Sequence, residues 1–181
     1  MSLWFVSATR LAESEFDRES ALARSLARVA EFSPFVLAAA YENSRPLPEI
    51  FNRAIDAAGP DDTIVFVHDD VWIDDYFIAQ RVAEGLDAFD VIGVAGNRRR
   101  VDGQPAWLFV DERLNWDDRS NLSGSVAHGV NPLGPVSSFG PAPVECALLG
   151  GGFIRARRST LGPKGGQFGP GTCGVRVLHC R

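Results

Sequence analysis

The chain has 181 residues, which at a usual domain size of roughly 150 residues allows one ordinary domain and little beyond it. With 45% hydrophobic and 23% charged residues, it is too apolar for a disordered chain and too mixed for a fibre or a coiled coil. Its formal net charge of −5 argues against nucleic acid or anionic membranes as partners, because both attract a net basic protein.

Short apolar runs alternate with amphipathic segments along the first half of the chain. The runs are rich in β-branched residues and predict buried strands, and the amphipathic segments carry apolar residues at helical spacing. The predicted elements, in chain order, are strand 4–8, helix 14–31, strand 35–40, helix 46–58, strand 63–67, helix 74–86 and strand 91–95. Strands without polar alternation, separated by helices, are typical of a mainly parallel sheet covered on both faces. The predicted fold class is therefore α/β, Rossmann-like in its layers.

The pattern weakens after residue 96. Residues 107–110 and 126–128 predict short strands between polar loops, and 144–149 predict a last apolar strand. Three glycines and a basic turn or helix are expected to follow it, up to about residue 161. Residues 1–161 are therefore expected to form the folded domain.

The last part of the chain differs in composition. All 23 acidic residues lie at or before Glu145, and half of the 18 glycines lie at or after Gly150. Glycine loses much conformational entropy on ordering, so 162–181 is predicted to be a loose Gly-rich tail.

Cysteine usage and the start of the chain bear on localisation. The three cysteines, Cys146, Cys173 and Cys180, form no C-x-x-C pair and predict neither a disulfide framework nor a zinc site. No stretch approaches the roughly 18 apolar residues of a membrane span, and the start lacks a signal-peptide pattern. A reduced, cytoplasmic protein without a transmembrane segment is expected.

The strongest chemical signal is the sequence His68-Asp69-Asp70, which follows the predicted strand 63–67 directly. Ligands of open α/β sheets bind beyond the carboxyl ends of the strands. Paired carboxylates there suit Mg²⁺ or Mn²⁺, which would in turn hold phosphate oxygens. A turn capped by these carboxylates toward Asp74 is the purely structural alternative. Neither a G-x-G-x-x-G fingerprint nor a P-loop is present, which disfavours dinucleotide enzymes and P-loop NTPases.

Further candidates lie in the loops. Arg45 and the run 98–100 could contact phosphate, although basic loop residues are more often solvated. Trp72, Trp107 and Trp116 could stack on sugar rings or could belong to the core.

Several segments share features with one known family. They are Tyr41, Asn43-Ser44, the run 51–55, the strand with its acidic end 64–71, the run 91–96, and Gly151-Gly152-Phe153 with Arg155, Arg157, Arg158 and Leu161. Together with the order of elements, they resemble the GT-A fold of nucleotide-sugar glycosyltransferases, in particular the streptomycin-biosynthesis-type branch of family 2. The resemblance extends from about residue 4 to residue 161.

The resemblance implies a metal-dependent, inverting glycosyltransferase that uses a nucleoside-diphosphate sugar and an unknown saccharide or small-molecule acceptor. In the family a D-x-D position holds Mn²⁺ or Mg²⁺; here His68 stands at its first carboxylate, so Asp70 is the implied metal ligand, with Asp69 beside it. The implied donor-binding residues are Ser7, Asn43, Ser44, Arg45, His68 and Asp69. The implied acceptor side is formed by Gly151, Gly152 and Phe153.

One family feature has no counterpart in the chain. The family's general base is an acidic residue beyond the glycine segment, and this chain has no acid after Glu145. Base catalysis needs a group that accepts a proton within hydrogen-bond reach, and Arg and Gly cannot serve. Two expectations follow: Glu145 acts as the catalytic base, or the C-terminus is incomplete or altered.

Two other functions remain open at this point. A metal-dependent nucleotidyltransferase would also place carboxylates at a strand end, but Ser7-Ala8-Thr9-Arg10 lacks the glycine-rich loop usual in such enzymes. A catalytically silent remnant that binds nucleotide sugars is the non-enzymatic alternative.

Overall fold

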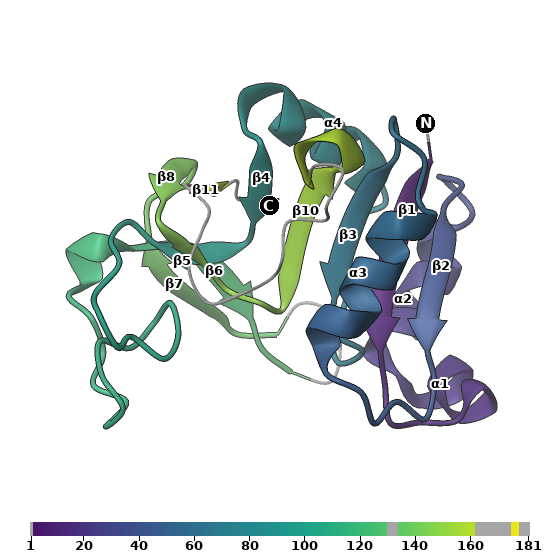
Figure 1. Ribbon diagram of the computed structural model, residues 1–181, viewed down its shortest axis with the longest axis horizontal. Helices are drawn as coiled ribbons and strands as arrows, with labels where there is room; N and C mark the ends of the chain where they lie inside the picture. The colour runs from purple at the N-terminus through teal and green to yellow at the C-terminus, as the bar shows by residue number, and fades with distance from the viewer. Residues whose placement is uncertain (1, 130–133, 162–174, 178–181) are drawn as a thin grey trace.

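The computed structural model describes residues 2–129 and 134–161, and the backbone of 175–177. These residues form a mixed α/β protein with a five-stranded sheet, a four-stranded sheet and a two-stranded pair (Figure 1). The strands are β1 Leu3–Ala8, β2 Val36–Ala40, β3 Thr63–Val67, β4 Val91–Gly93, β5 Ala95–Asn97, β6 Leu122–Ala127, β7 Val136–Gly140, β8 Val144–Cys146, β9 Leu148–Leu149, β10 Phe153–Arg157 and β11 Val175–Val177. The helices are α1 Glu13–Glu19, α2 Ala21–Val29, α3 Leu47–Ala57 and α4 Ile78–Ala88, with 3₁₀ turns η1 Arg119–Asn121 and η2 Arg158–Leu161.

The five-stranded sheet has the order β2-β1-β3-β10-β4. Strand β1 pairs in parallel with β2 and β3, whereas β10 pairs antiparallel with both β3 and β4. The expectation of a mainly parallel sheet is therefore wrong. Strand β10, which comes late in the chain, lies between the earlier strands β3 and β4. In the four-stranded sheet β7-β6-β5-β9, every pairing is antiparallel.

Helices cover both faces of the five-stranded sheet, as predicted. One face packs against α1, α2 and α4 through a core that includes Phe5, Phe16 and Val65. The other face packs against α3 through Val6, Ile55 and Phe66. All five residues of β3 are buried. Burial of each of its larger apolar side chains stabilises the folded state by about 1.5–3 kcal/mol.

The predicted strand 91–95 is divided between the two large sheets. Strand β4 belongs to the five-stranded sheet and β5 to the four-stranded sheet, with Val94 between them. The neighbouring strand approaches this bend very closely: a Cβ at Gly124 would lie 2.1 Å from the Val94 carbonyl oxygen, and Gly124 has a φ of +93°. Glycine is therefore required at position 124.

Other boundaries also differ from the prediction. The predicted helix 14–31 is two helices, because Ser20 caps α2 by accepting a hydrogen bond from the Ala23 N–H at 2.9 Å. The predicted helix 74–86 begins only at Ile78, after Asp75 has accepted a bond from the Phe77 N–H at 2.8 Å.

The second half of the chain departs further. Residues 107–110 form no strand, and Phe109 makes two isolated bridges, to Ala106 and Trp116. The predicted strand 144–149 is broken into β8 and β9. The basic segment after the glycines begins as strand β10, and only its end, from Arg158, forms the expected turn, the 3₁₀ turn η2.

The expected loose tail at 162–181 lies outside the described residues, except for β11, which pairs antiparallel with β8. Cys146 is a free, buried thiol, and burial raises its pKa to about 11. Across the described ranges, no helix has the length and apolar character that crossing a membrane requires.

Candidate functional site

The topology selects one edge of the five-stranded sheet as the place for a ligand. Strands β1, β2 and β3 are parallel, so their carboxyl ends share one edge (Figure 1). From β1 the chain crosses to β2 on one side and then to β3 on the other. This reversal makes the carboxyl ends of β1 and β3 a topological switch point, where open α/β sheets bind their ligands.

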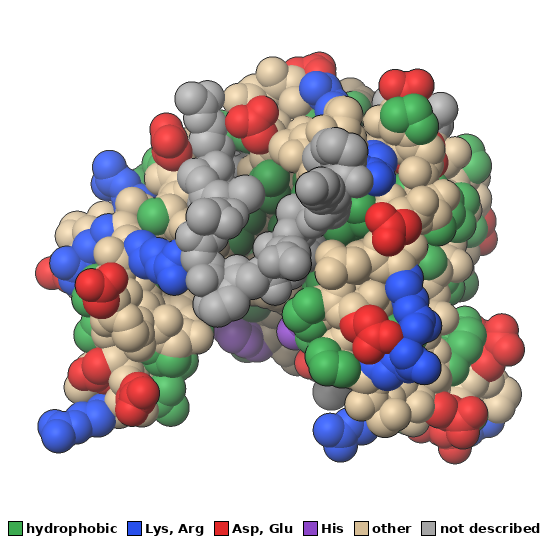
Figure 2. All heavy atoms as spheres, in the orientation of Figure 1, with side chains coloured by type: hydrophobic (Ala, Val, Ile, Leu, Met, Phe, Trp, Pro, Cys, Tyr) green, Lys and Arg blue, Asp and Glu red, His purple; other side chains and the backbone are tan. Residues whose placement is uncertain are grey.

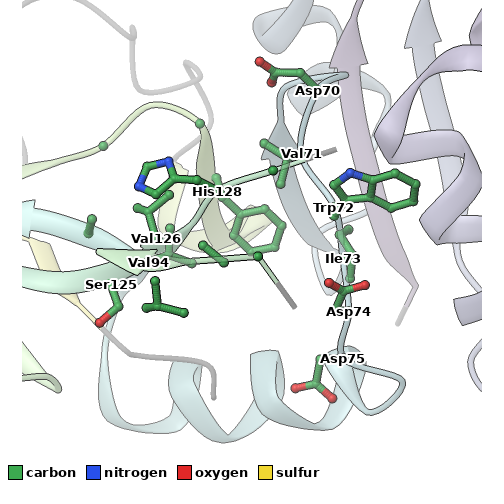
Figure 3. Close-up of a pocket in the computed structure, with 18 of the residues that line it drawn as sticks. Asp70, Val71, Trp72, Ile73, Asp74, Asp75, Val94, Ser125, Val126 and His128 are labelled. Carbon is green, nitrogen blue, oxygen red and sulfur yellow. The ribbon is translucent and has the colours of Figure 1, made fainter. Parts of the chain in front are cut away.

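A cavity of about 820 Å³ opens beside this switch point, between the two large sheets. In Figure 2, histidine side chains are visible between the two halves of the molecule. One wall consists of the segment after β3, and Val126 and His128 lie across the cavity from it (Figure 3). The start of β7 and the glycines before β10 complete the lining. The volume lies within the range of about 300–1,000 Å³ typical of small-molecule sites.

Three aspartates line the cavity, and only one lacks a basic partner. Asp74 pairs with Arg28 of α2 at 3.0 Å, and Asp75 pairs with Arg81 of α4 at 2.6 Å. The carboxylate of Asp70 is exposed and makes no hydrogen bond or ion pair with any residue that the structure describes. Asp70 is therefore the carboxylate of this wall that is available to a cation.

The residues before Asp70 have other surroundings. Asp69 is half-buried, does not line the cavity, and its backbone carbonyl accepts a bond from the Leu22 N–H at the start of α2. His68 is exposed, and its backbone N–H donates to the Gly152 carbonyl at 3.2 Å. This bond ties the acidic turn to the glycine segment, which lies some eighty residues further along the chain.

That glycine segment forms an open part of the cavity wall. Gly151 and Gly152 line the cavity, and a Cβ added at either would meet no atom of the described residues within 4 Å. Phe153, the first residue of β10, also lines the cavity, and its side chain is buried in the core. The predicted metal ligand Asp70 and the predicted acceptor-side residues thus face one cavity.

The predicted donor residues of the β2–α3 loop lie at the same sheet edge but not in the cavity wall. Asn43 and Arg45 close a turn on each other: the Arg45 N–H donates to Asn43 Oδ1 at 3.1 Å, and Asn43 Nδ2 donates to the Arg45 carbonyl at 2.9 Å. The Arg45 side chain pairs with Glu49. Ser44, between Asn43 and Arg45 in the sequence, is exposed. The Asn43 N–H donates to the Thr9 carbonyl and so joins this loop to the end of β1.

Ser7 lies in β1 near the switch point. It is fully buried, and its Oγ has no hydrogen-bond partner among the described residues. Such a buried hydroxyl is uncommon, because leaving it unpaired costs about 1–3 kcal/mol.

The local sequence did not indicate that Arg155 and His128 belong to the cavity. Arg155 of β10 is 2% exposed, and its guanidinium lies 3.9 Å from the ring centre of Phe153. His128 follows β6 and lies across the cavity from Asp70, with Nε2 2.9 Å from Ser137 Oγ (Figure 3). An arginine in a basic run and an isolated histidine are normally assigned to solvent, and only the tertiary fold brings these two into the cavity.

Glu145, the predicted catalytic base, does not line this cavity. It is exposed on β8 and lines a separate open pocket with Arg98, Arg99 and Cys146. Trp72 lines the cavity, and the guanidinium groups of Arg24 and Arg28 lie over its ring at 5.1 and 5.6 Å.

The donor set of the cavity fits a divalent cation held jointly with a ligand. Within the described ranges, no three His, Cys, Asp or Glu residues are grouped closely enough to hold a metal by themselves. Mg²⁺ usually takes one or two carboxylates and completes its shell with water and substrate phosphates. A single free carboxylate, Asp70, beside an open cavity meets that requirement.

The chain matches no protein-family model and no curated protein.

Proposed function

We propose that the protein is a metal-dependent, inverting glycosyltransferase of GT-A-like fold, whose donor is a nucleoside-diphosphate sugar bound in the 820 Å³ cavity. The observation that carries the proposal is the carboxylate of Asp70, which has no partner among the described residues and lies at the switch point, in the cavity that Gly151 and Gly152 also line. Proposed acceptors are a saccharide or a small molecule, which would enter past the glycines.

Electrostatics supports a diphosphate accompanied by a cation. An exposed carboxylate repels phosphate, and a divalent cation between them converts that repulsion into binding. Asp70 would hold the cation, with Mn²⁺ or Mg²⁺ as the candidates, and the cation would stabilise the departing diphosphate. Arg155 places a permanent positive charge in the same cavity wall, where low exposure strengthens its attraction for a phosphate.

The reaction would be a single displacement. An acceptor hydroxyl oxygen bonds to the anomeric carbon, the bond from that carbon to the diphosphate oxygen breaks, and the electron pair leaves with the diphosphate. Configuration at the anomeric carbon is thereby inverted. The acceptor proton needs a base in the cavity, and His128 replaces Glu145 in this role because it lines the cavity wall. Histidine accepts protons readily near neutral pH, and the contact with Ser137 fixes its ring.

The test is calorimetric titration of UDP, GDP and dTDP into the wild-type protein, with Mn²⁺ and again with EDTA. We expect one of the three diphosphates to bind in Mn²⁺ and to lose its affinity in EDTA. Asp70→Asn should abolish the metal-dependent part of the affinity without altering the far-UV circular dichroism. Asp56→Asn is the matched control, because Asp56 is equally exposed but lies on α3, away from the cavity.

Equal binding by wild type and Asp70→Asn would remove Asp70 from the site. Absence of binding by a folded wild-type sample would defeat the donor-site proposal. Metal-dependent binding without turnover, even with acceptors supplied, would favour a silent nucleotide-sugar binder over an enzyme.

A further inference from the structure

Three aromatic side chains form a row that leads from the cavity to the surface. The ring centres of Trp107 and Phe139 are 4.9 Å apart at 86°, and those of Phe139 and Trp116 are 6.2 Å apart at 39°. Trp107 lines the cavity, whereas Trp116 is 56% exposed. The row therefore continues the acceptor side of the cavity outward, and we call these three residues the aromatic row.

The inner end of the aromatic row is fixed by close packing. A Cβ on Gly150 would lie 3.0 Å from Trp107 Nε1, so glycine at this position lets the indole pack against the backbone. Asn97 Nδ2 donates to the Trp107 carbonyl at 2.9 Å. Trp107 thus keeps one position at the mouth of the cavity.

The outer end is anchored by a buried carboxylate next to Trp116. The side chain of Asp117 has no exposed surface and accepts bonds from Arg99, Asn97 and Asn121. These bonds hold the pKa of Asp117 well below its usual range, with the Arg99 bond as the largest cause. Because Asn97 also bonds the Trp107 carbonyl, one polar network joins the backbone at Trp107 to Asp117, the neighbour of Trp116. A preformed surface loses little conformational entropy when a ligand binds.

The segments that carry the row also hold polar and apolar side chains. Ser137 and Phe139 both belong to β7, and Ser137 Oγ lies 2.9 Å from His128 Nε2. Leu114, two residues before Trp116, and Val136, at the start of β7, are exposed at 56% and 65%. Exposed aromatic faces next to hydroxyl and imidazole groups suit a ligand that has apolar faces and polar edges.

We propose that the aromatic row is a saccharide-binding platform, which takes glycans longer than one sugar residue. The axial C–H bonds of a pyranose ring carry partial positive charge and stack on the negative faces of aromatic rings. Ser137 and His128 supply partners for the hydroxyl groups at the ring edge. That this glycan is the acceptor rests on the glycosyltransferase function proposed above, and its reacting hydroxyl would then lie at the Trp107 end.

The experiment titrates glucose and three neutral tetrasaccharides, cellotetraose, maltotetraose and chitotetraose, into the full chain by calorimetry without nucleotide or metal. At least one tetrasaccharide should bind, and more tightly than glucose. Trp116→Ala should lower that affinity at least tenfold, whereas Trp116→Phe should retain most of it. The matched control is Phe32→Ala, which removes a 59% exposed aromatic residue that pairs with Tyr76 instead.

The two proposals fail separately. Asp70→Asn should bind the tetrasaccharide like wild type, so loss of the donor site leaves the platform intact. Failure of all three tetrasaccharides to bind the folded wild-type protein overturns the platform, as does unchanged affinity in Trp116→Ala. Sedimentation that shows wild-type self-association abolished by Trp116→Ala would instead assign the row to a contact between copies, and would overturn it too.

Discussion

Replacement of Asp117 by asparagine should destabilise the protein and loosen the segment that carries the aromatic row. Oδ1 of Asp117 accepts from Arg99 Nη2, Asn121 Nδ2 and the Asp118 N–H, and Oδ2 accepts from Arg99 Nε at 3.0 Å and Asn97 Nδ2 at 2.8 Å. Asparagine can keep the first set, but its own NH₂ group then faces the two donors of the second set.

The magnitude follows from the bonds lost. Two hydrogen bonds to a buried carboxylate disappear, and bonds to charged groups contribute about 1.5–3 kcal/mol each. Because Arg99 is half exposed and regains water, the loss should be smaller than the sum of the two bonds, and we expect about 2–4 kcal/mol. For a chain of this size, 1 kcal/mol corresponds to about 2–4 °C, so the melting temperature should fall by about 4–16 °C.

Urea unfolding followed by far-UV circular dichroism measures this loss directly. Asp102→Asn is the control, since Asp102 is an exposed carboxylate in the same irregular segment. If Asp117→Asn unfolds at the same urea concentration as the control, the network does not stabilise the segment and the reasoning fails.

The same residue predicts a pH dependence. The folded-state pKa of Asp117 lies below its ordinary value of 3.8, mainly because of the Arg99 bond. The ionised carboxylate therefore stabilises the folded protein fully at pH values above the ordinary pKa, and this stabilisation is lost as pH falls through the folded-state pKa. The stability difference between wild type and Asp117→Asn should therefore be constant from pH 5 upward and should shrink only below about pH 4. A difference that vanishes already at pH 6 would contradict this assignment.

Two further substitutions test the cavity. Gly151→Leu should lower diphosphate affinity at least tenfold at unchanged melting temperature, because its Cβ would meet no atom of the described residues within 4 Å and its side chain would enter the cavity. Calorimetry with Gly151→Ala as control decides this, and undiminished affinity would place the ligand elsewhere. His128→Asn should leave diphosphate binding intact. With the tetrasaccharide that the protein binds supplied as acceptor, it should slow the release of nucleoside diphosphate from the donor sugar by about 10²–10⁴-fold. An unchanged rate would exclude His128 as the base.

The first three strands and the polar ends of β1 and β3 could be predicted because their signals are local. An uninterrupted β-branched run such as 63–67, followed at once by carboxylates, defines a buried strand and its exposed end without knowledge of any other part of the chain. The helix α3 is equally local, since its prolines and apolar spacing lie within its own residues.

The insertion of β10 could not be predicted in the same way. Its sequence, Phe-Ile-Arg-Ala-Arg, is too basic to predict a central strand, because arginine is almost never fully buried. Only pairing with β3 and β4, together with the contact between Arg155 and Phe153, accounts for its position. The antiparallel direction of β10 is what makes the sheet mixed.

The cavity wall depends on long-range contacts too. His128 and Trp107 lie in segments without clear periodicity, and each reaches the cavity through partners from other strands. Asn43 and Arg45 show the opposite case, because their hydrogen bonds with near neighbours keep them out of the cavity wall although their strand ends at the right edge.

The most direct test of the central claim measures free Mn²⁺ by electron paramagnetic resonance, first with the protein alone and then with the diphosphate that it binds. Since Asp70 is a single carboxylate with no second free acidic partner among the described residues of the cavity, Mn²⁺ should bind weakly to the protein alone and at least tenfold more tightly in the ternary complex. Asp70→Asn should abolish that gain. Tight Mn²⁺ binding without nucleotide, or an undiminished gain in Asp70→Asn, would contradict a cation shared between Asp70 and the diphosphate.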